Sequence, residues 1–214
     1  MSGTATTTST APAVPLRIAF IAGSSREGRF APVVADWFTA QAAGYGGIEL
    51  DVIDVADLEL PTTHPDWGTS PTPELAALAA RVAEADGFVV LTPEYNHSFP
   101  ASLKNFIDLH HTEWEAKAVG FVSYGGVGGG VGGGLRAVEQ LRLVFTELHC
   151  TSVREIVSFH NGWDHFGEGG KAYEVDGRDR RGEGHAGPTD LVGKGVAHGS
   201  RLASVQELTT GPLP

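Results

Sequence analysis

Short apolar runs alternate along this chain with longer amphipathic stretches. Five segments have the length and the apolar content of strands, and they occupy 18–22, 48–54, 88–92, 118–124 and 153–159. Between them, apolar side chains recur every three or four residues, which predicts helices within 32–41, 75–82, 100–110 and 135–148.

Strands that alternate with helices predict right-handed βαβ crossovers, a parallel sheet and helices on both of its faces. This is a three-layer α/β/α architecture. Ligands of such sheets bind beyond the carboxyl ends of the strands, where the strand order reverses. In a five-stranded sheet of order 2-1-3-4-5, the first, third and fourth strands are neighbours. The loops after these strands then meet at one place, and in this sequence they are the three unusual loops.

The composition is that of a globular protein, and it narrows the range of partners. The chain has 214 residues, of which 41% are hydrophobic and 19% charged, so a single α/β domain is expected. Its net charge of −11 repels phosphate backbones, so we expect no nucleic-acid partner. The single cysteine, Cys150, forms no intrachain disulfide, which favours buried packing and a cytoplasmic location.

The two ends of the chain depart from the strand–helix pattern. Residues 1–15 are rich in Thr, Ala and Ser without the apolar segment of a signal peptide, and we interpret them as a disordered leader. No run approaches the ~18 apolar residues of a membrane span, so no membrane partner is expected. Residues 16–214 are expected to form one domain, in which 161–187 is an irregular insert. A C-terminal helix over 189–208 follows, weakened by its glycines.

The loop after the first apolar run has the composition of an anion site. It reads Gly23-Ser24-Ser25-Arg26-Glu27-Gly28-Arg29-Phe30 and leads into a helix. Hydroxyls, backbone N–H groups and the helix dipole at such a place suit a phosphate. Arg26 and Arg29 add the positive charge that the chain as a whole lacks. The alternative is a plain strand–helix turn with solvated arginines.

The loop after the third run is braced by two prolines. It reads Thr92-Pro93-Glu94-Tyr95-Asn96-His97-Ser98-Phe99-Pro100, so an aromatic ring and several polar groups lie in a rigid segment. Such a segment can line a flat heteroaromatic ring, with backbone amides along the polar edge of that ring. Alternatively, Ser98 simply caps the helix that Pro100 begins.

The loop after the fourth run, residues 123–134, consists mostly of glycine. It begins Ser123-Tyr124-Gly125-Gly126, and its glycines allow the backbone to approach a ligand closely. A match to the G-x-G-x-x-G spacing within it carries little weight, because a segment this rich in glycine meets the pattern by chance. A flexible flap or a subunit contact is the alternative.

Histidines form no recognised metal or catalytic pattern. His110 and His111 are adjacent and are expected on different faces of a helix, while His160 and His165 flank the insert. No pair joins cysteine or carboxylates at the spacing of a metal site, so we expect no metal. No Ser-His-Asp or Cys-His arrangement can be argued, and no catalytic acid or base is assigned.

The three loops together resemble those of the NADPH-dependent FMN reductase family. The resemblance is carried by 23–29, by 93–98 with 103–105, and by 123–126, and it covers about residues 16 to 160. It implies a flavodoxin-like fold, FMN as the bound cofactor and NADPH or NADH as hydride donor. It also implies a homodimer or homotetramer with the flavin near a subunit interface.

By the same resemblance, each loop takes part in binding FMN. Ser24, Arg26, Arg29 and Phe30 would hold the phosphate, Pro93, Glu94, Tyr95 and Asn96 would line the isoalloxazine ring, and Ser123, Tyr124, Gly125 and Gly126 would close the other side. The flavin then carries the chemistry, and the protein positions it. The chain departs from the family after Asn161, where the charged insert begins, so the resemblance leaves the electron acceptor open.

The expected function is an NAD(P)H-dependent reductase that passes hydride to FMN and then to a small-molecule acceptor, such as free flavin, a quinone or an azo compound. One alternative is a flavodoxin-type electron-transfer module without NAD(P)H turnover of its own, against which Arg26 and Arg29 argue. Two further alternatives share the same sheet: a flavin-free interaction protein, and an NAD-binding protein that uses the glycine loop.

Overall fold

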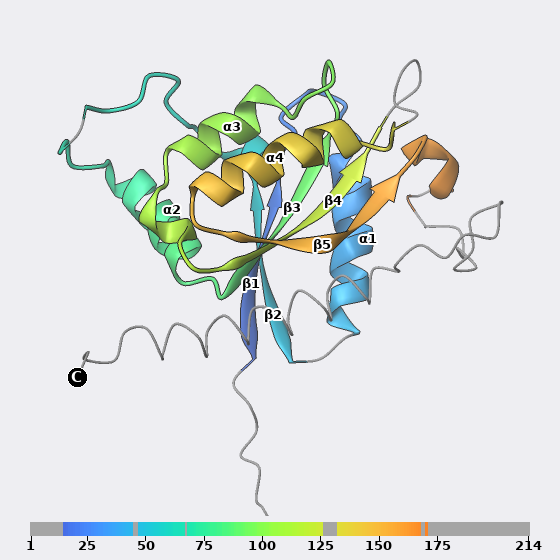
Figure 1. Cartoon of the computed structure of the whole chain (residues 1–214), viewed down its shortest axis with the longest axis horizontal. Coiled ribbons are helices and arrows are strands. Elements are labelled where there is room, and N and C mark those ends of the chain that lie inside the picture. Colours follow the sequence, from blue (N-terminus) through green and yellow to red (C-terminus); the bar gives the residue numbers. More distant parts are fainter. Residues whose placement is uncertain (1–14, 45–46, 67, 126–131, 168–169, 171–214) are drawn as a thin grey trace, which may run out of the picture.

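A five-stranded parallel sheet forms the centre of the molecule (Figure 1). The computed structural model describes residues 15–44, 47–66, 68–125, 132–167 and 170. The strands are β1 (Leu16–Ala22), β2 (Ile48–Asp54), β3 (Gly87–Pro93), β4 (Ala118–Tyr124) and β5 (Thr151–Phe159). Their order is β2-β1-β3-β4-β5, and every neighbouring pair is parallel. The expected flavodoxin-like topology is therefore confirmed.

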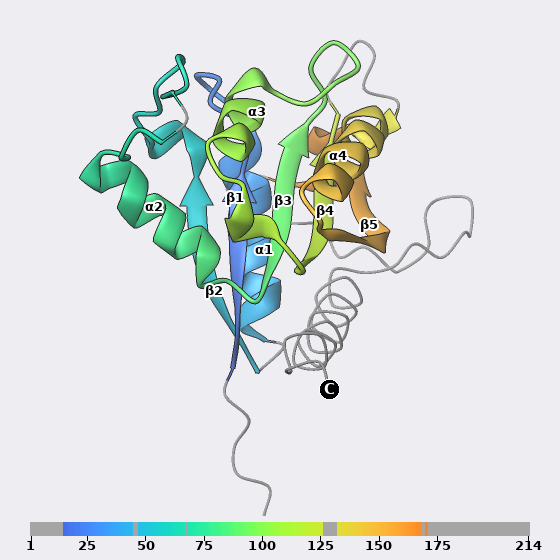
Figure 2. The ribbon, with the colours of Figure 1, turned by 60° about the vertical axis from the view of Figure 1, so that its left-hand side comes forward.

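The helices cover both faces of the sheet, as the alternating pattern predicts. They are α1 (Ala31–Ala43), α2 (Pro73–Ala83), α3 (Ala101–Asp108) and α4 (Leu135–Glu147), with short 3-10 turns η1 (Val55–Asp57), η2 (Thr112–Trp114) and η4 (Gly162–His165). Helices α2, α3 and α4 lie on one face and α1 lies on the other (Figures 1 and 2). The middle strands β3 and β4 are buried along their whole length, which explains their continuous apolar sequence.

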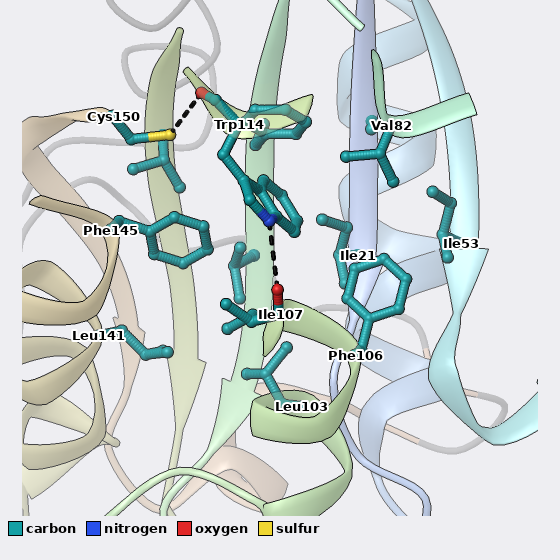
Figure 3. Packing of buried hydrophobic residues seen from close by; sticks show 14 of the residues in the cluster. Ile21, Ile53, Val82, Leu103, Phe106, Ile107, Trp114, Leu141, Phe145 and Cys150 are labelled. Carbon is teal, nitrogen blue, oxygen red and sulfur yellow. Dashed lines mark hydrogen bonds between the residues drawn. The ribbon is translucent and has the colours of Figure 1, made fainter. Parts of the chain in front are cut away.

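The larger core cluster lies under α2, α3 and α4 and is centred on Trp114 (Figure 3). The indole Nε1 of Trp114 donates to the carbonyl oxygens of His110 (3.0 Å) and Ile107 (3.3 Å), so the buried ring leaves no donor unpaired. The thiol of Cys150 donates to the carbonyl oxygen of Trp114 (3.0 Å), and burial raises the pKa of Cys150 to about 12. The expected packing role of this cysteine is confirmed.

Two local predictions differ from the structure. Helix α3 ends at Asp108, so His110 lies beyond it; its Nδ1 is 2.7 Å from the carbonyl oxygen of Phe106. The residue that starts α3, Pro100, has no side-chain cap, so Ser98 does not cap this helix. Residues 1–14 of the expected leader over 1–15, the C-terminal helix expected over 189–208 and most of the insert expected over 161–187 lie outside the described residues.

Candidate functional site

The first turn, between β1 and α1, is tied to the second turn by a buried hydroxyl. Ser24 is fully buried, and its Oγ lies 2.9 Å from the phenol oxygen of Tyr95. Just before it, Gly23 accepts a hydrogen bond from Ser102 Oγ (3.0 Å). A Cβ at Gly23 would lie 2.8 Å from the side chain of Leu103, so only glycine allows α3 to pack this closely. The turn is therefore fixed from both sides.

Helix α1 begins directly after this turn without a side-chain cap. Phe30 occupies the capping position and makes no side-chain hydrogen bond there, and a proline stands in the first helical turn. Leading N–H groups of a helix have no partner within the helix. An uncapped start that follows a strand of a parallel sheet is suited to a phosphate group.

The two arginines of the first turn have different surroundings. Arg29 forms an ion pair with Asp54 at the end of β2 (Nη2 to Oδ2, 2.5 Å), so this carboxylate balances its charge. Its Nε is buried and has no hydrogen-bond partner. Arg26 is exposed, and no ion pair joins its guanidinium to any residue that the structure describes. Of the two arginines, Arg26 is thus the one whose charge no described carboxylate balances.

The second turn doubles back tightly after β3. Tyr95 and Ser98 exchange two backbone hydrogen bonds, with N–O distances of 2.8 and 2.9 Å. The two residues between them, Asn96 and His97, have φ values of 50° and 66°. Positive φ at both central positions is the pattern of a type I′ turn, which costs free energy when neither residue is glycine. The turn therefore needs support from its surroundings.

That support comes from α4, through two side chains one helical turn apart. Gln140 accepts a hydrogen bond from Ser98 Oγ (2.6 Å) and donates one to the carbonyl oxygen of His97 (2.6 Å). Arg136 pairs with Glu94 (Nη1 to Oε1, 2.8 Å). We call Arg136 and Gln140 the α4 latch. The carboxylate of Glu94 is only 5% exposed, and its second oxygen, Oε2, has no partner.

The third turn follows β4 and lies directly beside the second. Pro93 and Tyr124 are partners in the β3–β4 register, and the amide of Glu94 donates to the carbonyl oxygen of Tyr124 (3.2 Å). Ser123 Oγ donates to the carbonyl oxygen of Gly133 (2.7 Å), which closes the glycine segment at its far end. Gly126 and the rest of 126–131 lie outside the described residues.

Tyr124 links the third turn to the first. Its ring meets the ring of Phe30 edge to face, with centroids 5.7 Å apart. Burial raises the pKa of the Tyr124 phenol, an effect that the hydroxyl of Ser24 partly opposes. The phenol is therefore neutral at physiological pH and available only as a hydrogen-bonding group.

One wall of the site was not found from the sequence. Turn η4, which follows β5, is bonded to the third turn through the amide of Gly162 and the carbonyl oxygen of Gly125 (3.1 Å). Its Trp163 stacks on Phe30, with centroids 4.7 Å apart. The signal for this wall was the aromatic pair Trp163 and Phe166 just after an apolar strand, within a segment interpreted as an irregular insert.

The arrangement fits a planar cofactor that carries a phosphate. Of the buried side-chain atoms that lack a partner among the described residues, two lie in these turns: Arg29 Nε, a cationic donor, and Glu94 Oε2, an anionic acceptor. A buried polar atom without a partner costs about 1–3 kcal/mol, which a bound ligand can recover. The ligand would need a negative group toward α1 and a donor toward Glu94.

A pocket away from the three turns suits such a ligand less well. It is bounded by residues 57–61 and the start of α2, and the carboxylates of Asp57, Glu59 and Glu74 line it. These carboxylates repel a phosphate. Within the described part of the chain no cluster of His, Cys, Asp and Glu could hold a metal ion, and no helix has the length and apolar content to cross a membrane.

Comparison with known proteins places the three turns in a family context. The family model described as NADPH-dependent FMN reductase matches residues 16–164. An NAD(P)H-dependent FMN reductase of Schizosaccharomyces pombe is 35% identical over 120 residues, which are 53% of this chain and 60% of that protein. A 2-hydroxy-1,4-benzoquinone reductase of a Burkholderia species is 34% identical over 139 residues, which are 64% of this chain and 69% of that protein.

Solved structures show the same fold. The flavoenzyme NAD(P)H:(acceptor) oxidoreductase FerB of Paracoccus denitrificans aligns with a TM-score of 0.61 at 22% identity, over 88% of this chain and 98% of that one. The sequence matches cover only part of the relatives' length. The match to an NAD(P)H:quinone oxidoreductase of Solanum tuberosum, at 36% identity, covers 48% of this chain and 54% of that protein. The chain thus spans somewhat over half the length of the first two curated relatives.

Proposed function

The chain belongs to the NADPH-dependent FMN reductase family, and from this membership we propose that it binds FMN at the three turns and passes electrons from NAD(P)H to a small acceptor. The observation that carries the proposal is the contact between Ser24 Oγ and Tyr95 Oη (2.9 Å), which joins two turns 71 residues apart in the sequence. The pairing of Pro93 with Tyr124 adds the third turn. One ligand can therefore touch all three.

In this proposal the first turn and the uncapped start of α1 bind the phosphate. Backbone N–H groups there would donate to the phosphate oxygens, and Arg26 would supply the charge. The Nε of Arg29, which has no partner, would donate as well, while Asp54 keeps the guanidinium in place.

The second and third turns would hold the flavin ring. Tyr95 and Asn96 would lie along one side of the ring. The backbone of residues 123–126 would approach the ring from the other side. The free oxygen of Glu94 would accept a hydrogen bond from an N–H of the ligand. Bound FMN would supply the redox chemistry, since it accepts a hydride from NAD(P)H and returns the electrons to an acceptor. A quinone is our preferred acceptor, because relatives of this chain are named quinone reductases.

The test is the visible spectrum of the purified protein, recorded anaerobically with and without NADPH and NADH. We expect a flavin spectrum that bleaches when either nucleotide is added and returns when 1,4-benzoquinone follows. A flavin spectrum that neither nucleotide bleaches would mean an electron-transfer module instead of a reductase. Protein that stays colourless and leaves the fluorescence of added FMN unchanged would refute flavin binding itself.

We also propose that the protein is a cytoplasmic homodimer or homotetramer. In its support, α4 carries two exposed leucines, Leu135 and Leu143, and the side chain of Leu143 is 74% exposed. Large exposed apolar side chains often mark a protein–protein contact. Light scattering coupled to size exclusion tests the assembly: the mass should be a multiple of the 22.5 kDa chain, and Leu143→Glu should lower it.

A further inference from the structure

Turn η4 connects the first and third turns, although it comes from the end of β5. Its Gly162 donates to Gly125 at the end of β4, and a Cβ at Gly162 would lie 3.2 Å from the ring of Phe30 and 3.5 Å from Tyr124. A side chain at position 162 would crowd the ring of Phe30, so glycine favours this close approach. The residue before it, Asn161, has a φ of 50°, an uncommon conformation for a residue other than glycine. The chain thus adopts an unfavourable turn that places η4 against the site.

Trp163 is the residue that this turn presents. One face of its indole stacks on Phe30 at an interplanar angle of 21°, and the residue is nonetheless 51% exposed. Phe30 in turn is packed edge to face by Tyr124 and by Phe166 (5.5 Å), so the support under the indole is rigid. A large aromatic ring with one face fixed and so much of its surface in solvent is placed to stack a second flat ring.

We propose that Trp163 is a stacking platform for the planar ring of a substrate, either the nicotinamide nucleotide or the quinone, beside the FMN site. The assignment rests on the proposed function for the identity of these substrates. Phe30 separates Trp163 from Tyr124, so Trp163 lies one ring further out than the wall assigned to FMN. A ligand that arrives after the cofactor meets this outer ring.

Steady-state kinetics of the FMN-loaded protein test the platform. Trp163→Leu removes the aromatic face, and we expect it to raise KM about tenfold for the substrate that stacks there, with kcat within about twofold of the wild type. Trp163→Phe should restore most of the affinity. A rise in KM for NADPH alone identifies the nucleotide as the stacked ligand, and a rise in KM for 1,4-naphthoquinone alone identifies the acceptor. Either result supports the platform.

A binding measurement on the protein as purified, which needs no turnover, separates this inference from the proposed function. Titration with NADP⁺ and with 1,4-naphthoquinone should quench part of the tryptophan fluorescence, and Trp163→Phe should lose that part. Val52→Ala, which removes an exposed apolar side chain of β2 outside the three turns, is the matched control and should leave both KM values unchanged.

The outcomes are distinct. If the wild type does not bleach with NAD(P)H, the proposed function fails, while the quenching titration still decides whether Trp163 stacks a ring. If Trp163→Leu leaves both KM values and the quenching unchanged, the platform does not exist. If it instead weakens FMN binding tenfold with both KM values unchanged, Trp163 belongs to the cofactor site and the proposal is wrong.

Discussion

Removal of one side chain of the α4 latch should weaken cofactor binding without unfolding the protein. Gln140→Ala deletes two hydrogen bonds of 2.6 Å, one to Ser98 and one to His97. Each is worth about 0.5–1.5 kcal/mol, so the supported turn loses roughly 1–3 kcal/mol. Two residues other than glycine at positive φ cost a similar amount, so the turn should leave this conformation for much of the time.

When only a fraction of the molecules have the site formed, the apparent dissociation constant of the ligand rises in inverse proportion to that fraction. A loss of 1–3 kcal/mol corresponds to a dissociation constant for FMN that is about 5- to 150-fold higher. The quenching of FMN fluorescence measures this constant directly. The midpoint of thermal unfolding should fall little, because Gln140 is exposed and touches no core residue in these bonds.

Two companion variants make the test specific. Glu139→Ala removes a neighbouring, 74% exposed side chain of α4 and should bind FMN as the wild type does. His97→Gly in the Gln140→Ala background removes the cost of one positive φ without changing a side chain proposed to line the flavin, and it should recover about tenfold of the lost affinity. Wild-type FMN affinity in Gln140→Ala alone would refute the idea that α4 supports this turn.

Three further outcomes follow from other contacts. Ser24→Ala removes the buried partner of Tyr95 and should raise the dissociation constant of FMN roughly tenfold, whereas Ser152→Ala, whose buried hydroxyl has no partner, should not change it. Burial lowers the pKa of His110, so below its unfolded pKa of about 6.5 the unfolded chain binds the proton more readily and the free energy of unfolding falls with pH. Urea denaturation at pH 7.5 and at pH 5 should show this loss of stability, and His110→Gln should make the loss smaller. Lys117 donates to three carbonyl oxygens, two of them at the end of α2. Lys117→Met should therefore lower the free energy of unfolding, measured by chemical denaturation, by about 2–3 kcal/mol, and an unchanged denaturation midpoint would contradict this.

The sheet could be predicted because its strands are buried on both faces. Continuous apolar runs in β3 and β4 leave little doubt about which residues form strands, and the alternation with helices imposes parallel pairing. The ends of the helices are harder to predict from the sequence, because they depend on contacts with side chains far away along the chain. Pro100 starts α3, but the hydroxyl expected to cap it, that of Ser98, is held by Gln140 instead.

The same reasoning explains what could be inferred about the site. Loops after neighbouring strands must meet, so Ser24, Tyr95 and Tyr124 could be placed together from the strand order alone. The side-chain partners could not, because a sequence does not show that Asp54 neutralises Arg29. The net positive charge at the proposed phosphate site is therefore smaller than the two arginines of the sequence suggest, and in the proposal it comes mainly from Arg26 and from backbone N–H groups.

The role of α4 illustrates why such support is hard to read from a sequence. Arg136 and Gln140 are ordinary polar residues on a helix surface, and their spacing alone indicates a solvent-exposed face. Their function becomes visible only through the turn they contact, where Asn96 and His97 hold a conformation that neither prefers. A turn that is unfavourable by itself and stable through contacts 42 or 43 residues away can hold one geometry for a ligand. This is the physical reason to regard the α4 latch as part of the proposed binding site, although neither of its residues is proposed to contact the ligand.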